Sequence, residues 1–210
     1  MSAARAACSL YLISPPVLGE GFAAALAAAL EPGIATAFQL RLKGADDDAV
    51  LRAADIVRPV CAAADISFIL NDRADLALRA GADGVHLGQG DGSVAQARTI
   101  LGVGREIGVT CHASRHLALE AGEAGADYVA FGSFFASDTK ASEHRPEPEI
   151  LTWWSQLMVL PCVAIGGITP ANAAPLVAAG ADFLAVSAAV WAHPDGAAAG
   201  VRAFQGVSGL

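Results

Sequence analysis

Acidic side chains follow two neighbouring apolar runs of the chain. Residues 68–72 read Phe-Ile-Leu-Asn-Asp, so a buried strand there would carry Asn71 and Asp72 at its end. Residues 84–91 read Gly-Val-His-Leu-Gly-Gln-Gly-Asp, so the next strand would be followed by Asp91. Because strands joined by a helix run parallel, both ends emerge at one edge of the sheet, where α/β proteins bind ligands. Two carboxylates brought together at that edge favour a hard cation with oxygen ligands, Mg²⁺ first among them.

Polar side chains also alternate along an earlier apolar run. Gln39, Arg41 and Lys43 are spaced i, i+2, i+4, so in an extended chain all three point the same way. One interpretation is a solvated strand face. In a closed barrel a strand has no such face before its end, so we expect an amide and two cations in the lumen or at its mouth.

Two later strand ends have the features of a phosphate site. Gly166-Gly167 follows one apolar run, and Ser187 follows the next and precedes another helix. Glycines expose backbone N–H groups, and the start of a helix favours an anion. At the last two strand ends of a barrel this combination predicts a bound phosphate group.

Strands and helices alternate along the whole chain. Eight strand–helix repeats predict a single-domain (β/α)₈ TIM barrel over residues 1–210. The alternative is a doubly wound open sheet, but no GxGxxG follows the first strand. Ala-Gly-Ala-Asp occurs at 80–83, 124–127 and 179–182, which predicts three equivalent turns with glycine ending each helix. The expected strands are 9–14, 37–42, 68–70, one starting at 84, 105–111, 128–132, 162–165 and 183–187; the expected helices are 21–30, 46–64, 73–80, 93–101, 114–125, 150–158, 169–179 and 196–204.

Composition narrows the range of partners and compartments. The 210 residues carry a net charge of −8, which argues against nucleic-acid binding because a phosphate backbone requires a basic face. A phosphorylated small molecule needs only a few local cations. No apolar run is long enough to span a bilayer, so no membrane partner is expected. The four cysteines show no CxxC pairing, which favours buried thiols in a reducing, cytoplasmic location. The sequence also allows a homo-oligomer.

Six motifs together resemble the thiamine phosphate synthase (thiamine-phosphate pyrophosphorylase) family. They appear in the family's order between residues 10 and 190, approximately. The resemblance implies a (β/α)₈ transferase of thiamine biosynthesis that joins hydroxymethylpyrimidine pyrophosphate to thiazole phosphate, giving thiamine phosphate and pyrophosphate. The motifs are Gln39-Leu-Arg-Leu-Lys43, Asn71-Asp72-Arg73 with Asp75, His86-Leu-Gly-Gln89 with Asp91, Thr139-Lys140, Ala164-Ile-Gly-Gly-Ile168 and Ala185-Val-Ser187.

The resemblance also implies a role for each matching residue. Asp72 and Asp91 would hold the Mg²⁺ that bridges the substrate's pyrophosphate. The catalytic set would be Arg41, Lys43 and Lys140, which stabilise the leaving group, and Thr110, which matches a family serine near it. The remaining substrate contacts would be Asn71 at the pyrophosphate, Gln39 at the aminopyrimidine, and Ser137, Thr139, Gly167, Val186 and Ser187 at the thiazole phosphate.

Departures from the family pattern leave two alternatives to weigh. The sixth loop usually reads Pro-Thr-x-Thr-Lys, whereas this chain has Ala-Ser-Asp-Thr-Lys at 136–140. The related thiazole tautomerase lacks the metal and pyrophosphate residues and typically carries a histidine where this chain has Ser133. A catalytically silent barrel that binds a phosphorylated metabolite is the other alternative, and the complete acidic pair argues against it.

Overall fold

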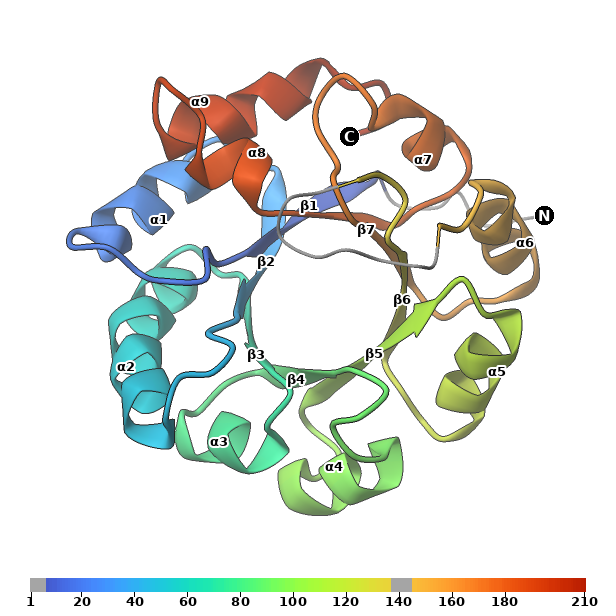
Figure 1. The fold of residues 1–210 in the computed structure, drawn as a ribbon, viewed down its shortest axis with the longest axis horizontal. Coiled ribbons are helices and arrows are strands. Elements are labelled where there is room, and N and C mark those ends of the chain that lie inside the picture. The colour runs from blue at the N-terminus through green and yellow to red at the C-terminus, as the bar shows by residue number, and fades with distance from the viewer. Residues whose placement is uncertain (1–6, 137–144) are drawn as a thin grey trace.

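Eight parallel strands close into a barrel in chain order (Figure 1). The computed structural model describes residues 7–136 and 145–210. The first and last strands pair with each other, so the sheet has no free edge and the open-sheet alternative is excluded. The predicted single-domain (β/α)₈ barrel is therefore confirmed. The strands are β1 Ser9–Ile13, β2 Ala35–Leu40, β3 Ser67–Asn71, β4 Gly84–Leu87, β5 Glu106–His112, β6 Tyr128–Gly132, β7 Cys162–Ile165 and β8 Phe183–Val186.

Helices form a ring around this barrel (Figure 1). Each predicted helix is present, with bounds that agree within about two residues except for the seventh, which begins at Ala174 rather than Thr169; a short helix directly after β8 was not predicted. The helices are α1 Phe22–Leu30, α2 Asp47–Ala63, α3 Ala74–Arg79, α4 Val94–Leu101, α5 Arg115–Glu123, α6 Glu149–Leu157, α7 Ala174–Ala178, α8 Ala188–Trp191 and α9 Ala197–Arg202, followed by the 3₁₀ helix η1 Ala203–Gly206.

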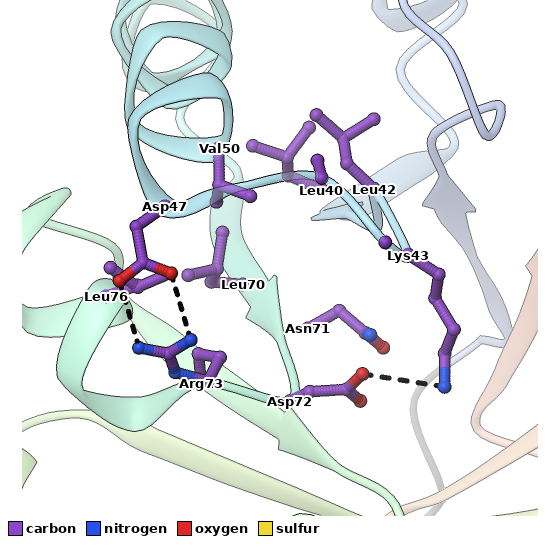
Figure 2. A pocket seen from close by; sticks show the side chains of 12 residues that line it. Leu40, Leu42, Lys43, Asp47, Val50, Leu70, Asn71, Asp72, Arg73 and Leu76 are labelled. Carbon is purple, nitrogen blue, oxygen red and sulfur yellow. Dashed lines mark hydrogen bonds and ion pairs between the residues drawn. The ribbon is translucent and has the colours of Figure 1, made fainter.

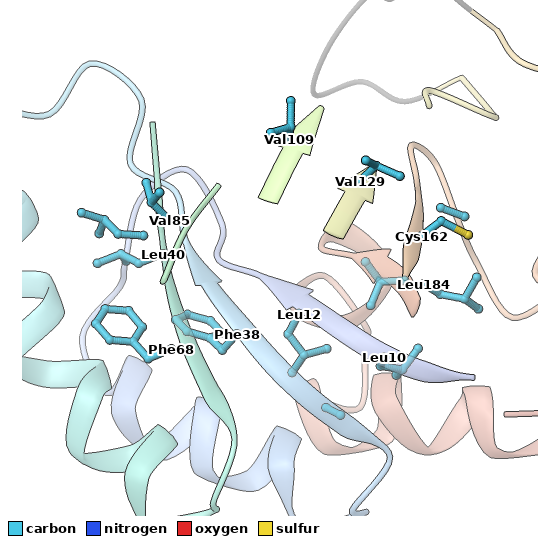
Figure 3. Close-up of a cluster of buried hydrophobic side chains, with 14 of the residues drawn as sticks. Leu10, Leu12, Phe38, Leu40, Phe68, Val85, Val109, Val129, Cys162 and Leu184 are labelled. Atoms are coloured by element: carbon cyan, nitrogen blue, oxygen red, sulfur yellow. The ribbon is translucent and has the colours of Figure 1, made fainter. Parts of the chain in front are cut away.

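The alternation of side chains along each strand creates two separate cores. In β1, Leu10 and Leu12 join the outer core between sheet and helices, which Figure 3 shows in part. The intervening Tyr11 and Ile13 belong to a smaller cluster inside the barrel. Because both faces of a barrel strand are buried, the strands read as nearly continuous apolar runs. A polar side chain that faces the lumen is therefore conspicuous.

The three Ala-Gly-Ala-Asp turns join helices to strands at equivalent places. Their glycines have φ of +64°, +88° and +100°, the left-handed conformation predicted for residues that end a helix. The aspartates add a contact that was not predicted. Each accepts a 2.7–2.8 Å hydrogen bond from a backbone N–H of the strand next to its own: Asp83 from Phe68, Asp127 from Ile107 and Asp182 from Cys162.

The environment of the cysteines and the length of the helices bear on two further expectations. All four cysteines are buried and none forms a disulfide, as predicted. Within residues 7–136 and 145–210, no helix has the length and apolar character needed to cross a membrane.

Candidate active site

The predicted acidic pair comes together at the carboxyl ends of β3 and β4. Asp72 follows β3 in the left-handed conformation, with φ +67°, which aspartate tolerates better than most residues. Its backbone N–H donates to the His86 carbonyl at 2.8 Å, and this bond fixes the turn. Burial raises the pKa of the Asp72 carboxyl, and the neighbouring Asp91 carboxyl raises it further. The site thus holds two acidic groups at close range.

Asp91 is held by its own loop. Its Oδ2 accepts a hydrogen bond from the Gly88 N–H at 2.9 Å, so the carboxylate folds back over the end of β4. A Cβ on Gly88 would lie 2.6 Å from that oxygen, so a larger residue there would require the Asp91 side chain to shift. The arrangement leaves Asp91 exposed at the mouth of the barrel.

Lys43 lies against the acidic pair, beyond the end of its strand. β2 ends at Leu40, two residues before the predicted Leu42, so Arg41 and Lys43 belong to the connection to α2. Their positions depend on other contacts. Lys43 Nζ lies 3.5 Å from Asp72 Oδ2, and its charge opposes the rise in the pKa of Asp72. Figure 2 shows Asn71, Asp72 and Lys43 on one side of a small pocket.

Ser14 fixes the backbone of Arg41. The Arg41 N–H donates to Ser14 Oγ at 2.9 Å, directly after β1, and Ser14 is buried. Ser187 Oγ donates to the Ser14 carbonyl at 3.3 Å. Ser14 therefore connects the first predicted cation with the predicted phosphate site after β8, a role that the sequence did not reveal.

A continuous chain of buried hydrogen bonds runs through the lumen below these groups. Gln39 Nε2 donates to the Tyr11 hydroxyl at 2.9 Å, and that hydroxyl lies 2.9 Å from the Tyr128 hydroxyl. The Tyr128 hydroxyl lies 3.1 Å from His86 Nδ1, and His86 Nε2 lies 2.8 Å from Thr110 Oγ1. Two predicted substrate residues, Gln39 and Thr110, are thus the ends of one network.

Burial keeps the middle of this network uncharged. It lowers the pKa of His86 to about 4, helped by the Arg41 charge and opposed by Asp91. The pKa values of Tyr11 and Tyr128 are raised, also chiefly by burial. At neutral pH the lumen therefore presents neutral donors and acceptors in fixed positions.

Sequence reasoning missed Tyr11, His86 and Tyr128 as site residues. Each is a polar side chain at a lumen-facing position of an otherwise apolar strand, as Gln39 is. That alternation was the available signal. The alternation can indicate these lumen positions but not which of them meet, because the partners lie up to 117 residues apart in the chain.

The connections after β6 and β7 pack directly on each other. The Phe135 N–H donates to the Gly166 carbonyl at 3.0 Å, and a Cβ on Gly167 would collide with the Ala136 carbonyl. Asn172 Nδ2 donates to the Gly167 carbonyl at 3.0 Å. The predicted Gly167 is thus placed against the start of the sixth loop. The predicted Ser137, Thr139 and Lys140 lie outside the described residues.

Val186 and Ser187 lie where the sequence placed them, at the end of β8. Val186 is the last residue of that strand, and Ser187 directly precedes α8. The structure therefore brings Gln39, Arg41, Lys43, Asn71, Asp72, Asp91, Thr110, Gly167, Val186 and Ser187 to the lumen or to the carboxyl-end face of the barrel.

Comparison with known proteins identifies relatives over nearly the whole chain. The family described as thiamine monophosphate synthase matches residues 10–190. The thiamine-phosphate synthase of Rhodospirillum centenum is 57% identical over 201 residues, covering 95% of this chain and 97% of the relative. That of Erythrobacter litoralis is 58% identical over 199 residues, covering 93% and 92%.

Solved structures give the same result. Thiamine phosphate pyrophosphorylase from Pyrococcus furiosus superposes with a TM-score of 0.84 at 32% identity, covering 95% of this chain and 94% of the other. A 3-hexulose-6-phosphate synthase superposes with a TM-score of 0.64 at 18% identity, covering 97% and 99%, and shows likeness of fold alone.

Proposed function

The chain belongs to the thiamine monophosphate synthase family and is a transferase, and from this we propose the reaction that its site performs. The enzyme joins 4-amino-2-methyl-5-hydroxymethylpyrimidine pyrophosphate to thiazole phosphate. The bond between the pyrimidine methylene carbon and oxygen breaks, and its electron pair leaves with pyrophosphate. The thiazole nitrogen then forms a new bond to that carbon with its lone pair, which gives thiamine phosphate.

The observation that carries the proposal is the cluster of Asp72, Asp91 and Lys43 above a neutral polar lumen. Expelling pyrophosphate develops negative charge at the leaving group and positive charge on the pyrimidine methylene. The cation Lys43 at the mouth suits the negative charge of the leaving group. The neutral lumen, with His86 uncharged, does not repel the positive charge of the methylene. The two charges would thus separate along the axis of the barrel.

The acidic pair fits Mg²⁺. That ion is commonly bound through one or two carboxylates together with substrate phosphates. Among the described residues no cluster of three or more His, Cys, Asp and Glu side chains could hold a metal ion, so substrate oxygens would complete the shell around Asp72 and Asp91. When bound, Mg²⁺ would neutralise charge on the leaving pyrophosphate.

Protein side chains would fix the reacting groups without forming a covalent bond. Gln39 would hold the aminopyrimidine, and its amide is already oriented by Tyr11. Thr110, oriented by His86, would donate its hydroxyl near the leaving group. Arg41, Asn71 and Lys140 would bind the pyrophosphate beside Lys43. Because the electron-rich pyrimidine stabilises its own carbocation, positioning of the thiazole nitrogen is enough for the second step.

The thiazole phosphate would occupy the side of the mouth next to β7 and β8. Gly167 has φ +62°, and its carbonyl is turned toward Asn172, so its peptide has a fixed orientation. Val186 and Ser187 follow β8, and Ser137 and Thr139 of the sixth loop would complete the contacts. The nucleophile and the pyrophosphate would then lie on opposite sides of the lumen opening.

The test is a direct assay of the purified protein. It is incubated with Mg²⁺, the pyrimidine pyrophosphate and thiazole phosphate, and thiamine phosphate and pyrophosphate are quantified. We expect equal amounts of the two products and no product after chelation with EDTA. Product that persists in EDTA would refute the metal requirement, and no product under any condition would refute the reaction. Electron-withdrawing substituents on the pyrimidine should slow turnover if the step is dissociative.

A further inference from the structure

Arg73 follows Asp72 in the chain and makes two forked ion pairs at once. Its Nη1 and Nη2 lie 3.0 and 3.2 Å from the two carboxylate oxygens of Asp47. Its Nε and Nη2 lie 2.8 and 2.7 Å from those of Asp75. A guanidinium that is bound by two carboxylates through its fork has a defined orientation, unlike a single exposed ion pair.

This guanidinium joins two different connections of the barrel. Asp75 belongs to the same connection as Arg73, at the start of α3. Asp47 is the first residue of α2 and directly follows the connection that carries Arg41 and Lys43. The Arg73–Asp47 pair is therefore a bridge between the loop of the cations and the loop of the predicted metal ligand.

A pocket lies between the two connections. It has a volume of about 170 Å³, with Leu40, Leu70 and Leu76 among its walls. In Figure 2 the Arg73–Asp47 pair lies on one side of this pocket and the Lys43–Asp72 pair lies on the other. The space between the two loops is thus spanned by ion pairs on either side.

We propose that Arg73 is a positioning residue whose bridge to Asp47 sets the separation of Lys43 and Asp72. It thereby sets the affinity of the site for Mg²⁺ with pyrophosphate. The inference rests on the proposed function, because it assigns Asp72 to the metal and Lys43 to the pyrophosphate. The bridge would act without touching the substrate, by holding two loops in register. Residues that orient metal ligands typically change affinity or activity by about 10–100-fold when they are removed.

The experiment compares Asp47→Asn, Arg73→Gln and a matched control. Asp48→Asn removes the same charge from the same first turn of α2, and Asp48 is exposed with no ion pair among the described residues. Binding of Mg²⁺ with inorganic pyrophosphate is measured by calorimetry. KM for the pyrimidine pyrophosphate, kcat and the thermal midpoint are also measured. We expect Asp47→Asn and Arg73→Gln each to weaken binding by about tenfold. Asp48→Asn should bind as the wild type does, and all thermal midpoints should agree closely.

The sign of the Asp47→Asn effect separates positioning from long-range electrostatics. Mg²⁺ with pyrophosphate carries a net negative charge, so removing the Arg73 cation would by itself weaken its binding, whereas removing the Asp47 anion would by itself strengthen it. Only the bridge predicts that both variants weaken it, and that the double variant is no worse than either single one. Tighter binding in Asp47→Asn, or wild-type binding in both variants, would overturn the inference. Failure of the wild type to bind Mg²⁺ with pyrophosphate would instead refute the proposed function.

Discussion

Asp72 illustrates how a candidate site residue can be unfavourable for its own fold. It adopts a left-handed backbone, and burial and the Asp91 carboxyl raise its pKa. A raised carboxyl pKa means that the ionised form is less favourable in the folded protein than in the unfolded chain. A bound cation beside the two carboxylates would favour the ionised form. An aspartate at this position thus suits a ligand better than it suits stability.

We predict that Asp72→Asn loses activity without losing stability. Asparagine tolerates the left-handed conformation and has nearly the same shape, but it lacks the charge that a metal ligand needs. Turnover should fall by more than about 100-fold, beyond the usual effect of outer-shell residues. The thermal midpoint measured without Mg²⁺ should stay equal or rise. Steady-state kinetics and thermal unfolding check both parts, and near-normal turnover with Mg²⁺ would remove Asp72 from the metal site.

His86 makes the stability of the barrel depend on pH. Its pKa is about 4 in the fold and 6.5 in its ordinary state, so the unfolded chain binds a proton more readily. The contribution of the neutral imidazole is fully present above pH 6.5 and is lost as the pH falls toward 4. Integrated over that window the loss is about 3 kcal/mol of unfolding free energy.

Urea unfolding at several pH values would measure this effect. We expect the wild type to lose stability steadily between pH 6.5 and 4, and His86→Gln to show a shallower slope there. His116→Gln, which changes an exposed histidine on α5, is the control. Parallel profiles for wild type and His86→Gln would show that His86 is not the responsible group.

At the scale of elements, each aspartate of the Ala-Gly-Ala-Asp turns hydrogen-bonds to the backbone near the start of the neighbouring strand. Asp127 Oδ2 accepts from the Ile107 N–H at 2.7 Å and from Arg98 Nη2 at 2.6 Å. Ile107 is fully buried, so its N–H has no access to water if the carboxylate is removed. These contacts lie at the amino ends of the strands, opposite the candidate active site. In barrels of this kind, residues at the amino ends of the strands contribute to stability rather than to catalysis.

Asp127→Ala should therefore destabilise the protein while sparing its chemistry. Leaving a buried backbone donor without a partner costs about 1–3 kcal/mol. We expect a loss of that size in the free energy of unfolding, with unchanged kcat per folded molecule. Glu123→Ala, on the exposed surface of α5, is the control and should be neutral. A stability equal to that of the wild type would mean that the turn holds without the carboxylate.

The order of elements was predictable from the sequence because every strand is a short apolar run with a glycine-marked turn nearby. The exact ends of the strands and helices were less predictable. β2 ends two residues before the predicted Leu42, because the Arg41 backbone bonds to Ser14 rather than continuing the ladder. α8 was missed because a four-residue helix shows no periodicity. Local pattern therefore identified the strands that hold the site, whereas tertiary contacts decide where its cations lie.

At the scale of the whole molecule, the lumen network joins strands that are distant in the chain. Tyr11 in β1 and Tyr128 in β6 meet across the lumen, with rings 6.0 Å apart and edge to face. Gly108 in β5 leaves room for the Tyr128 ring, since a Cβ there would collide with it. Such meetings depend on closure of the barrel, so the sequence could indicate the polar lumen positions but not their partners.

The Tyr128 hydroxyl is the centre of this network, and its removal should weaken the closed barrel as a whole. Tyr128→Phe keeps the ring in place but leaves the Tyr11 hydroxyl and His86 Nδ1 each without one partner. We expect a loss of about 1–3 kcal/mol in unfolding free energy, measured by urea titration at pH 7. Tyr11→Phe should also destabilise, since it removes the acceptor of Gln39 Nε2. Because the two hydroxyls share one bond, the double variant should lose less than the sum of the single losses. Strictly additive losses would show that the two hydroxyls do not interact, and that the two halves of the lumen are stabilised independently.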